Sequence, residues 1–284
     1  MGSFIDMLAT IPNLHIDDIQ VLEQDISADF NVNIQDVRDT RSIIQKAFDQ
    51  LDVKADFCLQ PAHDRRKNLL ICDMDSTLIG QECIDELADY AGVKDKVSSI
   101  TERAMRGELD FEEALIERVG LLKDLPLSKL QECFDERIKL NPGADVLAAT
   151  MKAHGASTVI VSGGFTFFTE RIAALAGFDH NQANTLIDDG KNLTGDVGRP
   201  ILGRDAKKSA LDKFSADRGG SSNAIAIGDG ANDLAMIQAA GLGVAYKAKP
   251  IVANAAHCAI QYTDLTTALY FQGYKKSDFV TPSR

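Results

Sequence analysis

Short apolar runs alternate with segments of helical periodicity along most of the chain. Three of these runs, at residues 69–72, 158–161 and 224–227, are four residues long and almost entirely apolar, a pattern typical of strands buried on both faces. Apolar residues recur at helical spacing in between, as in residues 145–154 and 205–214. Repeated strand–helix units of this kind predict a parallel, doubly wound α/β sheet with right-handed crossovers.

The alternation is interrupted after the first of these strands by a stretch with helical periodicity only. Four short amphipathic helices are expected between residues 81 and 140, the third opened by a capping box, Asp110-x-x-Glu113, and the fourth by Ser128. We interpret this stretch as a helical cap inserted over the end of the first strand. Farther along, Asp189-Gly190 between apolar residues predicts a small β-hairpin flap.

The first 66 residues have the pattern of a separate, small α+β unit. An amphipathic helix that carries Ile44 and Phe48 is expected to begin at Asp39 or Thr40. Two strand-like segments flank this helix, at residues 16–30 and 55–59. The chain is therefore expected to divide into an N-terminal unit of residues 1–66, an α/β core of residues 67–80 and 141–284, and a cap of residues 81–140.

The composition is that of a globular protein and excludes several classes of partner. Of 284 residues, 45% are hydrophobic and 25% are charged, with a net charge of −12. This charge argues against binding to nucleic acid or to an anionic membrane, and no apolar run approaches the ~20 residues of a membrane helix. The five cysteines form no CxxC pair, and no signal peptide is visible. We therefore expect a cytoplasmic protein with reduced thiols.

Polar side chains that could take part in catalysis or ligand binding follow three of the predicted strands. Asp73 and Asp75 come directly after the first strand, Ser162-Gly163 after the second, and Asp229 with Asp233 after the third. Each motif alone is also typical of an ordinary turn. Because the carboxyl ends of parallel strands meet at one edge of a sheet, however, the three loops are expected to converge. Carboxylates this close repel one another, and a hard divalent cation such as Mg²⁺ is the natural compensation.

The three loops together resemble the motifs of the haloacid-dehalogenase (HAD) superfamily and, within it, those of the phosphoserine phosphatases. The resemblance is carried by Asp73-Met74-Asp75-Ser76-Thr77, by Val161-Ser162-Gly163-Gly164-Phe165 and by Gly228-Asp229-Gly230-Ala231-Asn232-Asp233. It extends over about residues 69–275 and leaves out the N-terminal unit. It implies a HAD-like Rossmannoid core and Mg²⁺-dependent hydrolysis of O-phospho-L-serine, the last step of serine biosynthesis.

The resemblance also implies a role for each acidic residue. Asp73 is expected to be the nucleophile that forms an aspartyl phosphate, and Asp75 the general acid and base. The expected Mg²⁺ ligands are the Asp73 carboxylate, the Asp75 backbone carbonyl and the Asp229 carboxylate, with Asp233 close behind or as a direct ligand.

Substrate binding is divided between the core and the cap in such enzymes. An ammonium and a carboxylate on the substrate require one acid and one arginine, and Glu82 and Arg118 match these positions. Lys207, rather than its neighbour Lys208, is expected to bind phosphate. The remaining expected contacts are the phosphate binders Ser162 and Gly163, the orienting residue Asn232, and the apolar walls Met105 and Phe111.

Two enzymatic alternatives and one non-enzymatic alternative stay open from the sequence. The chain is also consistent with transfer of the phosphoryl group from Asp73 to another alcohol such as homoserine, or with hydrolysis of another small phosphomonoester. A catalytically silent amino-acid sensor is the third possibility, although a binding module has no need of an acid at Asp75. For residues 1–66 we expect a role in homodimerisation or in feedback by serine.

Overall fold

The computed structural model describes residues 8, 11, 14–34, 36–105 and 108–282. Its centre is a six-stranded sheet in the order β10-β9-β8-β3-β4-β5, in which all neighbouring strands are parallel. The predicted α/β class is therefore confirmed. The strands of this sheet are β3 (Leu69–Cys72), β4 (Ser157–Phe165), β5 (His180–Asn184), β8 (Ala224–Gly228), β9 (Leu242–Tyr246) and β10 (Cys258–Ile260).

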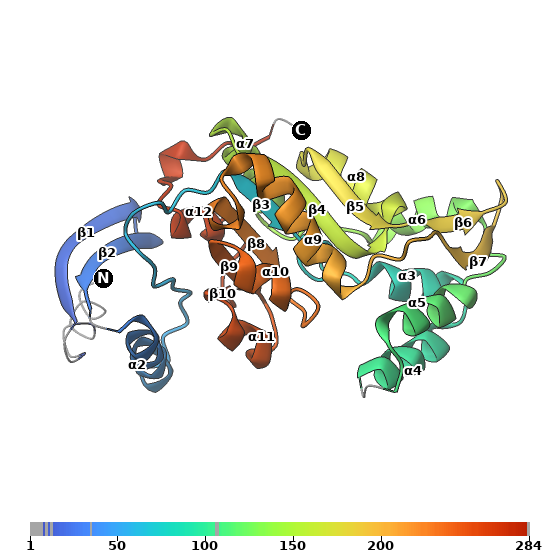
Figure 1. The fold of residues 1–284 in the computed structure, drawn as a ribbon, viewed down its shortest axis with the longest axis horizontal. Coiled ribbons are helices and arrows are strands. Elements are labelled where there is room, and N and C mark those ends of the chain that lie inside the picture. The colour runs from blue at the N-terminus through green and yellow to red at the C-terminus, as the bar shows by residue number, and fades with distance from the viewer. Residues whose placement is uncertain (1–7, 9–10, 12–13, 35, 106–107, 283–284) are drawn as a thin grey trace.

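Helices cover both faces of the sheet because both faces of its strands are apolar. Leu70 and Cys72 of β3 pack in the same cluster as residues of α7, α8 and α12, whereas Leu69 and Ile71 pack with residues of α9 and α10. Figure 1 shows the layers, with α9 and α10 in front of the strands. The helices around the sheet are α7 (Ala144–Ala153), α8 (Thr166–Ala176), α9 (Arg204–Ser215), α10 (Leu234–Ala239), α11 (Pro250–Ala255) and α12 (Thr267–Phe271).

The order of the strands reverses beside β3, and this reversal places the site. The chain runs from β3 through β4 to β5 on one side and then from β8 through β9 to β10 on the other. Cys72, the last residue of β3, lies opposite Ile160 of β4 and Ile227 of β8. The carboxyl ends of these three strands therefore meet at a topological switch point, where open α/β sheets bind their ligands.

The cap consists of the four predicted helices and is joined to the predicted hairpin. The capping box of Asp110 and Glu113 is present at the start of α5, but α6 begins after Pro126 rather than at Ser128. Backbone hydrogen bonds connect residues 124–127 of the cap to residues 191–193 of the hairpin, and both lie on the right of Figure 1. These elements are α3 (Cys83–Tyr90), α4 (Lys94–Met105), α5 (Phe111–Gly120), α6 (Leu127–Arg137), β6 (Leu186–Asp188) and β7 (Leu193–Val197).

The N-terminal residues pack against the opposite end of the sheet (Figure 1). They form a hairpin of β1 (His15–Glu23) and β2 (Ser27–Asn33), followed by α2 (Val37–Gln50). The helix begins after Asp36, whose side chain accepts from the backbone N–H of Asp39, so the expected N-cap at Asp39 or Thr40 was wrong by one turn. Residues 55–59 form no strand; they are tied to the core individually, as where the Asp56 carboxylate accepts from the backbone N–H groups of residues 261–263.

Within the described ranges, no helix combines the length and the apolar character needed to cross a membrane.

Candidate active site

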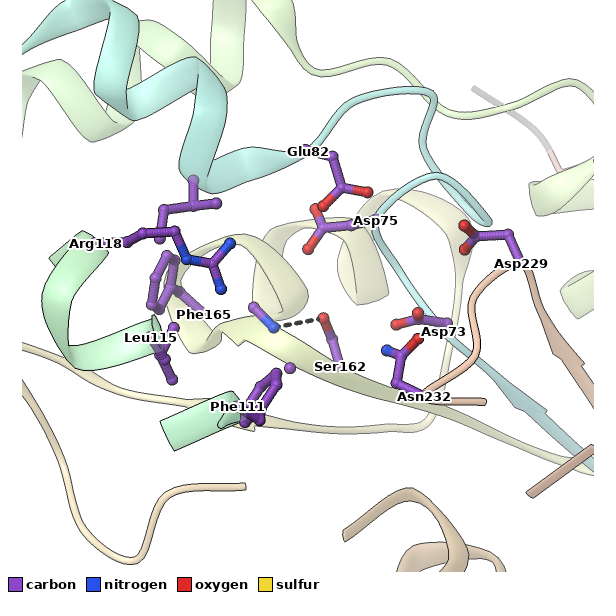
Figure 2. Close-up of a pocket in the computed structure, with 13 residues that line it drawn as sticks. Asp73, Asp75, Glu82, Phe111, Leu115, Arg118, Ser162, Phe165, Asp229 and Asn232 are labelled. Atoms are coloured by element: carbon purple, nitrogen blue, oxygen red, sulfur yellow. Dashed lines mark hydrogen bonds between the residues drawn. The ribbon is translucent and has the colours of Figure 1, made fainter. Parts of the chain in front are cut away.

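A pocket opens at the carboxyl ends of β3, β4 and β8, beneath the cap helices α3 and α5. Figure 2 shows side chains of the core and of the cap converging on it. Its volume of about 170 Å³ is suited to a small metabolite, since pockets for drug-sized ligands measure roughly 300–1,000 Å³. The residues that line it are Asp73, Asp75, Glu82, Ile84, Phe111, Leu115, Arg118, Ser162, Gly163, Gly164, Phe165, Asp229 and Asn232.

A buried lysine lies between two of the aspartates. Lys207 Nζ is 2.6 Å from Asp73 Oδ2 and 2.5 Å from Asp233 Oδ1, and all three side chains are at most 8% exposed. Lys208 instead pairs with Asp212 on the surface of α9. The helix therefore directs Lys207 into the site and Lys208 away from it.

Three carboxylates gather around this lysine. Asp73, Asp229 and Asp233 each present an oxygen within 4.8 Å of the others, and Thr77 Oγ1 donates to Asp229 Oδ1 at 2.9 Å. Burial raises the pKa of Asp73 well above its usual range, and the charge of Asp233 adds to this while Lys207 opposes it. Burial also raises the pKa of Asp229 to about 6. One ammonium cannot neutralise three carboxylates, so this oxygen donor set fits a hard divalent cation.

Asp75 lies on the cap side of these carboxylates, below Glu82 in Figure 2. Its Oδ1 accepts a hydrogen bond from the backbone N–H of Cys83 at 3.1 Å. Burial, followed by the charge of Glu82, raises the pKa of Asp75 to about 7. A carboxyl group with a pKa near neutrality is suited both to donate and to accept a proton. A Cβ on Gly164 would lie 2.7 Å from Asp75 Oδ2, so glycine is required for this close approach.

Near the end of β4, residues 162–164 leave the regular pairing with β5 as the Ser162 loop, which directs a hydroxyl group into the pocket. The backbone N–H of Gly164 donates to Ser162 Oγ at 2.9 Å, the dashed line in Figure 2. Because this bond uses an acceptor lone pair of the hydroxyl, the Ser162 O–H remains available as a donor to a ligand. Phe111 packs closely over the same loop, where a Cβ on Gly163 would lie 3.1 Å from its ring.

The cap contributes one acid and one base to the pocket. Ser76 Oγ donates to Glu82 Oε1 at 2.7 Å, and Arg118 Nε donates to the carbonyl of Ala114 at 3.1 Å. In Figure 2 the Glu82 carboxylate and the Arg118 guanidinium both point toward the cavity, Glu82 from the residue before α3 and Arg118 from α5. Desolvation raises the pKa of Glu82 and lowers that of Arg118. The two opposite charges thus lie on the cap side of the pocket, with Glu82 close enough to Asp75 for its charge to raise the pKa of that carboxyl.

A family model fits the region that contains this site. The model for haloacid dehalogenase-like hydrolases matches residues 70–238. The chain belongs to this hydrolase family.

Proteins similar to this HAD hydrolase are named phosphoserine phosphatases. The Archaeoglobus fulgidus protein is 41% identical over 84% of the chain and 70% of its own length, and the Haemophilus influenzae protein is 48% identical over 71% of the chain and 64% of its own length. The chain therefore spans less than two thirds of the Haemophilus protein.

Two solved structures are also similar. A HAD-family hydrolase from Salmonella enterica serovar Typhi is 32% identical with a TM-score of 0.83, covering 95% of this chain and 92% of that one. A phospho-aspartyl intermediate analogue of phosphoserine phosphatase is 42% identical with a TM-score of 0.66, covering 72% of this chain and 99% of that one. The first similarity includes the N-terminal residues, whereas the second is restricted to about the length of the core and cap.

The structure brings together nearly all of the residues predicted for the site of this HAD hydrolase. Lys207 and Asp233 lie behind Asp73 rather than on the pocket wall. Met105 is the last residue of α4, but its side chain lies outside the described residues. The predicted residues that line the pocket are Asp73, Asp75, Glu82, Phe111, Arg118, Ser162, Gly163, Asp229 and Asn232.

Several neighbours of these residues were not predicted. Ile84 and Leu115 line the pocket. Their helical spacing predicts that they face inward, but it does not distinguish the wall of a cavity from the interior of the cap. Ser76 and Thr77 hold Glu82 and Asp229 through hydrogen bonds. Their position within the Asp73–Thr77 motif is the feature of the sequence from which this role could have been predicted.

Proposed function

We propose that this HAD hydrolase is a phosphoserine phosphatase, which converts O-phospho-L-serine and water to L-serine and phosphate in serine biosynthesis. The observation that carries the proposal is the arrangement of charge in the pocket. Asp73 lies at the core end of the pocket, and Glu82 and Arg118 lie at the cap end. This arrangement supports binding of the ammonium of an amino acid by Glu82 and of its carboxylate by Arg118. The similarity to proteins named phosphoserine phosphatases supports the same substrate.

The proposed cation is Mg²⁺, and the carboxylate cluster fits it. We assign its protein ligands to the Asp73 carboxylate, the Asp75 backbone carbonyl and the Asp229 carboxylate, with Asp233 behind them or as a fourth ligand. When bound, the ion supplies positive charge that offsets the carboxylates and the phosphate dianion.

The chemistry then divides between two aspartates. An Asp73 carboxylate oxygen attacks phosphorus, the bond from phosphorus to the seryl oxygen breaks, and protonated Asp75 transfers its proton to that oxygen, which releases serine. Asp75, now a carboxylate, takes a proton from water as the water oxygen attacks the aspartyl phosphate. This step restores the Asp73 carboxylate and releases phosphate. The pKa of about 7 at Asp75 suits both proton transfers.

The phosphoryl oxygens need donors that are already in position. We assign this role to the Ser162 hydroxyl, the Gly163 amide and the Lys207 ammonium, with Asn232 orienting the group. Phe111 and Met105 are proposed as apolar walls that exclude water.

The parts of the chain have separate proposed roles. Residues 67–80 and 141–284 are proposed as the catalytic core, residues 81–140 as the substrate-selecting cap, and residues 1–66 as a regulatory or homodimerisation unit. A cytoplasmic location is proposed as well, and the five free cysteines support a reducing compartment. Light scattering by the full chain, with and without L-serine, measures the dimer and its response to the product.

A panel of small phosphomonoesters tests the proposed reaction. Phosphate release is measured with Mg²⁺, with EDTA and with Ca²⁺, and O-phospho-L-serine is expected to have the highest kcat/KM with Mg²⁺ and no turnover with EDTA. Asp73→Asn is expected to abolish turnover while the protein stays folded, as measured by its circular dichroism spectrum and a cooperative melting transition. A higher kcat/KM for another phosphomonoester would refute the substrate, and labelled phosphate on added homoserine would establish transfer instead of hydrolysis.

A further inference from the structure

Asn184 is a buried residue outside the pocket that contacts two segments of the site. It is the last residue of β5 and is 2% exposed. Its Nδ2 donates to the carbonyl oxygens of Gly163 at 2.9 Å and Leu202 at 3.4 Å, and its Oδ1 accepts from the Leu202 N–H at 2.7 Å. Only one orientation of the amide places the donor toward both carbonyls and the acceptor toward the N–H group.

The first of these contacts replaces a missing backbone pairing. Along β4 and β5, Val161 pairs with Gln182 and Phe165 with Asn184, so the register shifts between them and the intervening residues of β4 lie outside the ladder. Such irregularities redirect side chains beside active sites. Here they displace the Ser162-Gly163 segment from the regular pairing, and the Asn184 side chain supplies a hydrogen bond to it.

This hydrogen bond acts on the donors of the loop. The Gly163 carbonyl and the Gly164 N–H belong to one planar peptide group, so a bond that fixes the carbonyl also fixes the N–H. That N–H donates to Ser162 Oγ at 2.9 Å and thereby directs the serine O–H into the pocket. The orientation of the Ser162 hydroxyl thus depends on Asn184 through two hydrogen bonds.

The second contact leads to the buried lysine. Leu202 lies two residues before α9, the helix that carries Lys207. The Asn184 amide therefore connects the segment that enters this helix to the Ser162 loop. The two elements otherwise belong to different strand–helix units of the sheet.

We propose that Asn184 is a positioning residue for the phosphoryl group, which sets the distance and orientation of the Ser162 loop relative to α9. The inference rests on the proposed function in so far as Ser162 and Lys207 bind the phosphoryl oxygens. Donors aimed at a developing charge lose their effect when they are displaced by a fraction of an ångström.

Asn184→Asp is the sharpest variant because it conserves the shape of the side chain. One carboxylate oxygen keeps the bond from Leu202 N–H, whereas the other faces the Gly163 carbonyl and repels it. At pH 8 we expect kcat/KM for O-phospho-L-serine and the affinity for inorganic phosphate each to fall about tenfold or more. This is the effect of losing one hydrogen bond to a charged group, here the bond from the displaced Ser162 hydroxyl to the phosphoryl oxygens. The inhibition constant of L-serine is expected to change less than about twofold, because L-serine has no phosphoryl group. A general structural defect would instead weaken the binding of phosphate and of L-serine alike.

The pH profile gives a second readout. A buried carboxyl without a cationic partner is protonated at higher pH than usual, and its O–H then donates to the Gly163 carbonyl. The loss relative to wild type at the same pH is therefore expected to shrink as the pH falls from 8 to 5.5. Asn184→Ala, which removes the bond without adding charge, is expected to lose phosphate affinity equally at both pH values.

Asn181→Asp is the matched control. Asn181 lies on the same strand, and its Oδ1 accepts from Thr169 Oγ1 at 2.9 Å, a bond that a carboxylate keeps. This variant is expected to retain the phosphate affinity of the wild type. Phosphate affinity within twofold of the wild type in both Asn184 variants would overturn the inference. A wild type that does not hydrolyse O-phospho-L-serine refutes only the proposed substrate, since p-nitrophenyl phosphate turnover and phosphate binding still report on Asn184.

Discussion

Replacing Lys207 by methionine tests the electrostatics of the site most directly. The substitution nearly conserves volume, but it removes the ammonium that contacts the Asp73 and Asp233 carboxylates at 2.6 and 2.5 Å. The lysine is 3% exposed, so water cannot take its place. Removing one partner of a buried ion pair typically costs about 3–5 kcal/mol. We expect Lys207→Met to lower the free energy of unfolding by this amount in metal-free buffer.

Urea unfolding at pH 8, in EDTA and in Mg²⁺, measures this effect. Burial alone lowers the pKa of Lys207, but Asp73 and Asp233 more than offset this and raise it. The stabilisation is therefore fully present below the unfolded pKa of 10.5 and is lost only as the pH rises through the higher folded value. With Mg²⁺ the loss is expected to be smaller, because a bound cation offsets part of the missing charge.

Lys208→Met is the matched control on the same helix. Lys208 pairs with Asp212 one turn away and is 38% exposed, and exposed pairs of this kind contribute about 0.3–0.5 kcal/mol. If Lys207→Met and Lys208→Met lower the free energy of unfolding by the same small amount in EDTA, the assignment of Lys207 as the essential counter-charge is wrong.

Four further outcomes are expected from the pocket. Asp75→Asn should lower kcat for O-phospho-L-serine by about 10²–10⁴, the usual contribution of a general acid. It should lower kcat less for p-nitrophenyl phosphate, because that leaving group needs no proton. Equal losses for the two substrates in steady-state kinetics would contradict the role of Asp75 as general acid. Because burial raises the folded pKa of Asp75 to about 7 from 3.8, its ionisation costs stability as the pH rises through this window, so in EDTA the same variant should unfold with a free energy a few kcal/mol higher than wild type at pH 8 and nearly equal at pH 4. Arg118→Ala should raise KM for O-phospho-L-serine about tenfold or more, through loss of a charged hydrogen bond, and leave KM for p-nitrophenyl phosphate unchanged. Gly228→Ala should lower the melting temperature, at a cost of about 1–3 kcal/mol, since its Cβ would lie 2.4 Å from Asp233 Cγ. Gly120→Ala is the control, because among the described residues its Cβ would meet no atom within 4 Å beyond its chain neighbours and its own helix backbone; it should melt no lower than the wild type.

The core of the fold was predictable because its signals are local. Four-residue apolar runs end directly in polar motifs, and β3 and β8 begin at the predicted residues, Leu69 and Ala224. The convergence of three loops follows from parallel strand order alone, so distant residues such as Asp73 and Asp229 were expected to meet. The hydrophobic periodicity therefore predicts the helices and strands, and also the edge of the sheet at which the functional residues lie.

The interior of the site was less predictable because its contacts are not local in sequence. Asn184 binds backbone groups 18 and 21 residues away, and no pattern around it distinguishes it from an ordinary strand end. The N-terminal errors have a similar origin. Residues 55–59 have the composition of a strand but form none; instead, the Asp56 side chain accepts hydrogen bonds from the backbone N–H groups of residues 261 and 263. The helix begins after Asp36 because the Asp36 side chain accepts from the backbone N–H of Asp39.

The raised pKa values of Asp73, Asp75 and Asp229 have a common physical cause and a common consequence. Each carboxyl is desolvated at the end of a buried strand, so its charge costs the folded protein stability. A structure selected for stability alone would place apolar residues there, whereas Lys207 offsets only part of the charge. We expect the uncompensated charge to give the pocket affinity for a cation, and a bound cation to favour binding of a phosphate dianion. The same buried charge therefore destabilises the fold and supports the proposed function, so substitutions such as Asp75→Asn are expected to stabilise the fold while they lower activity.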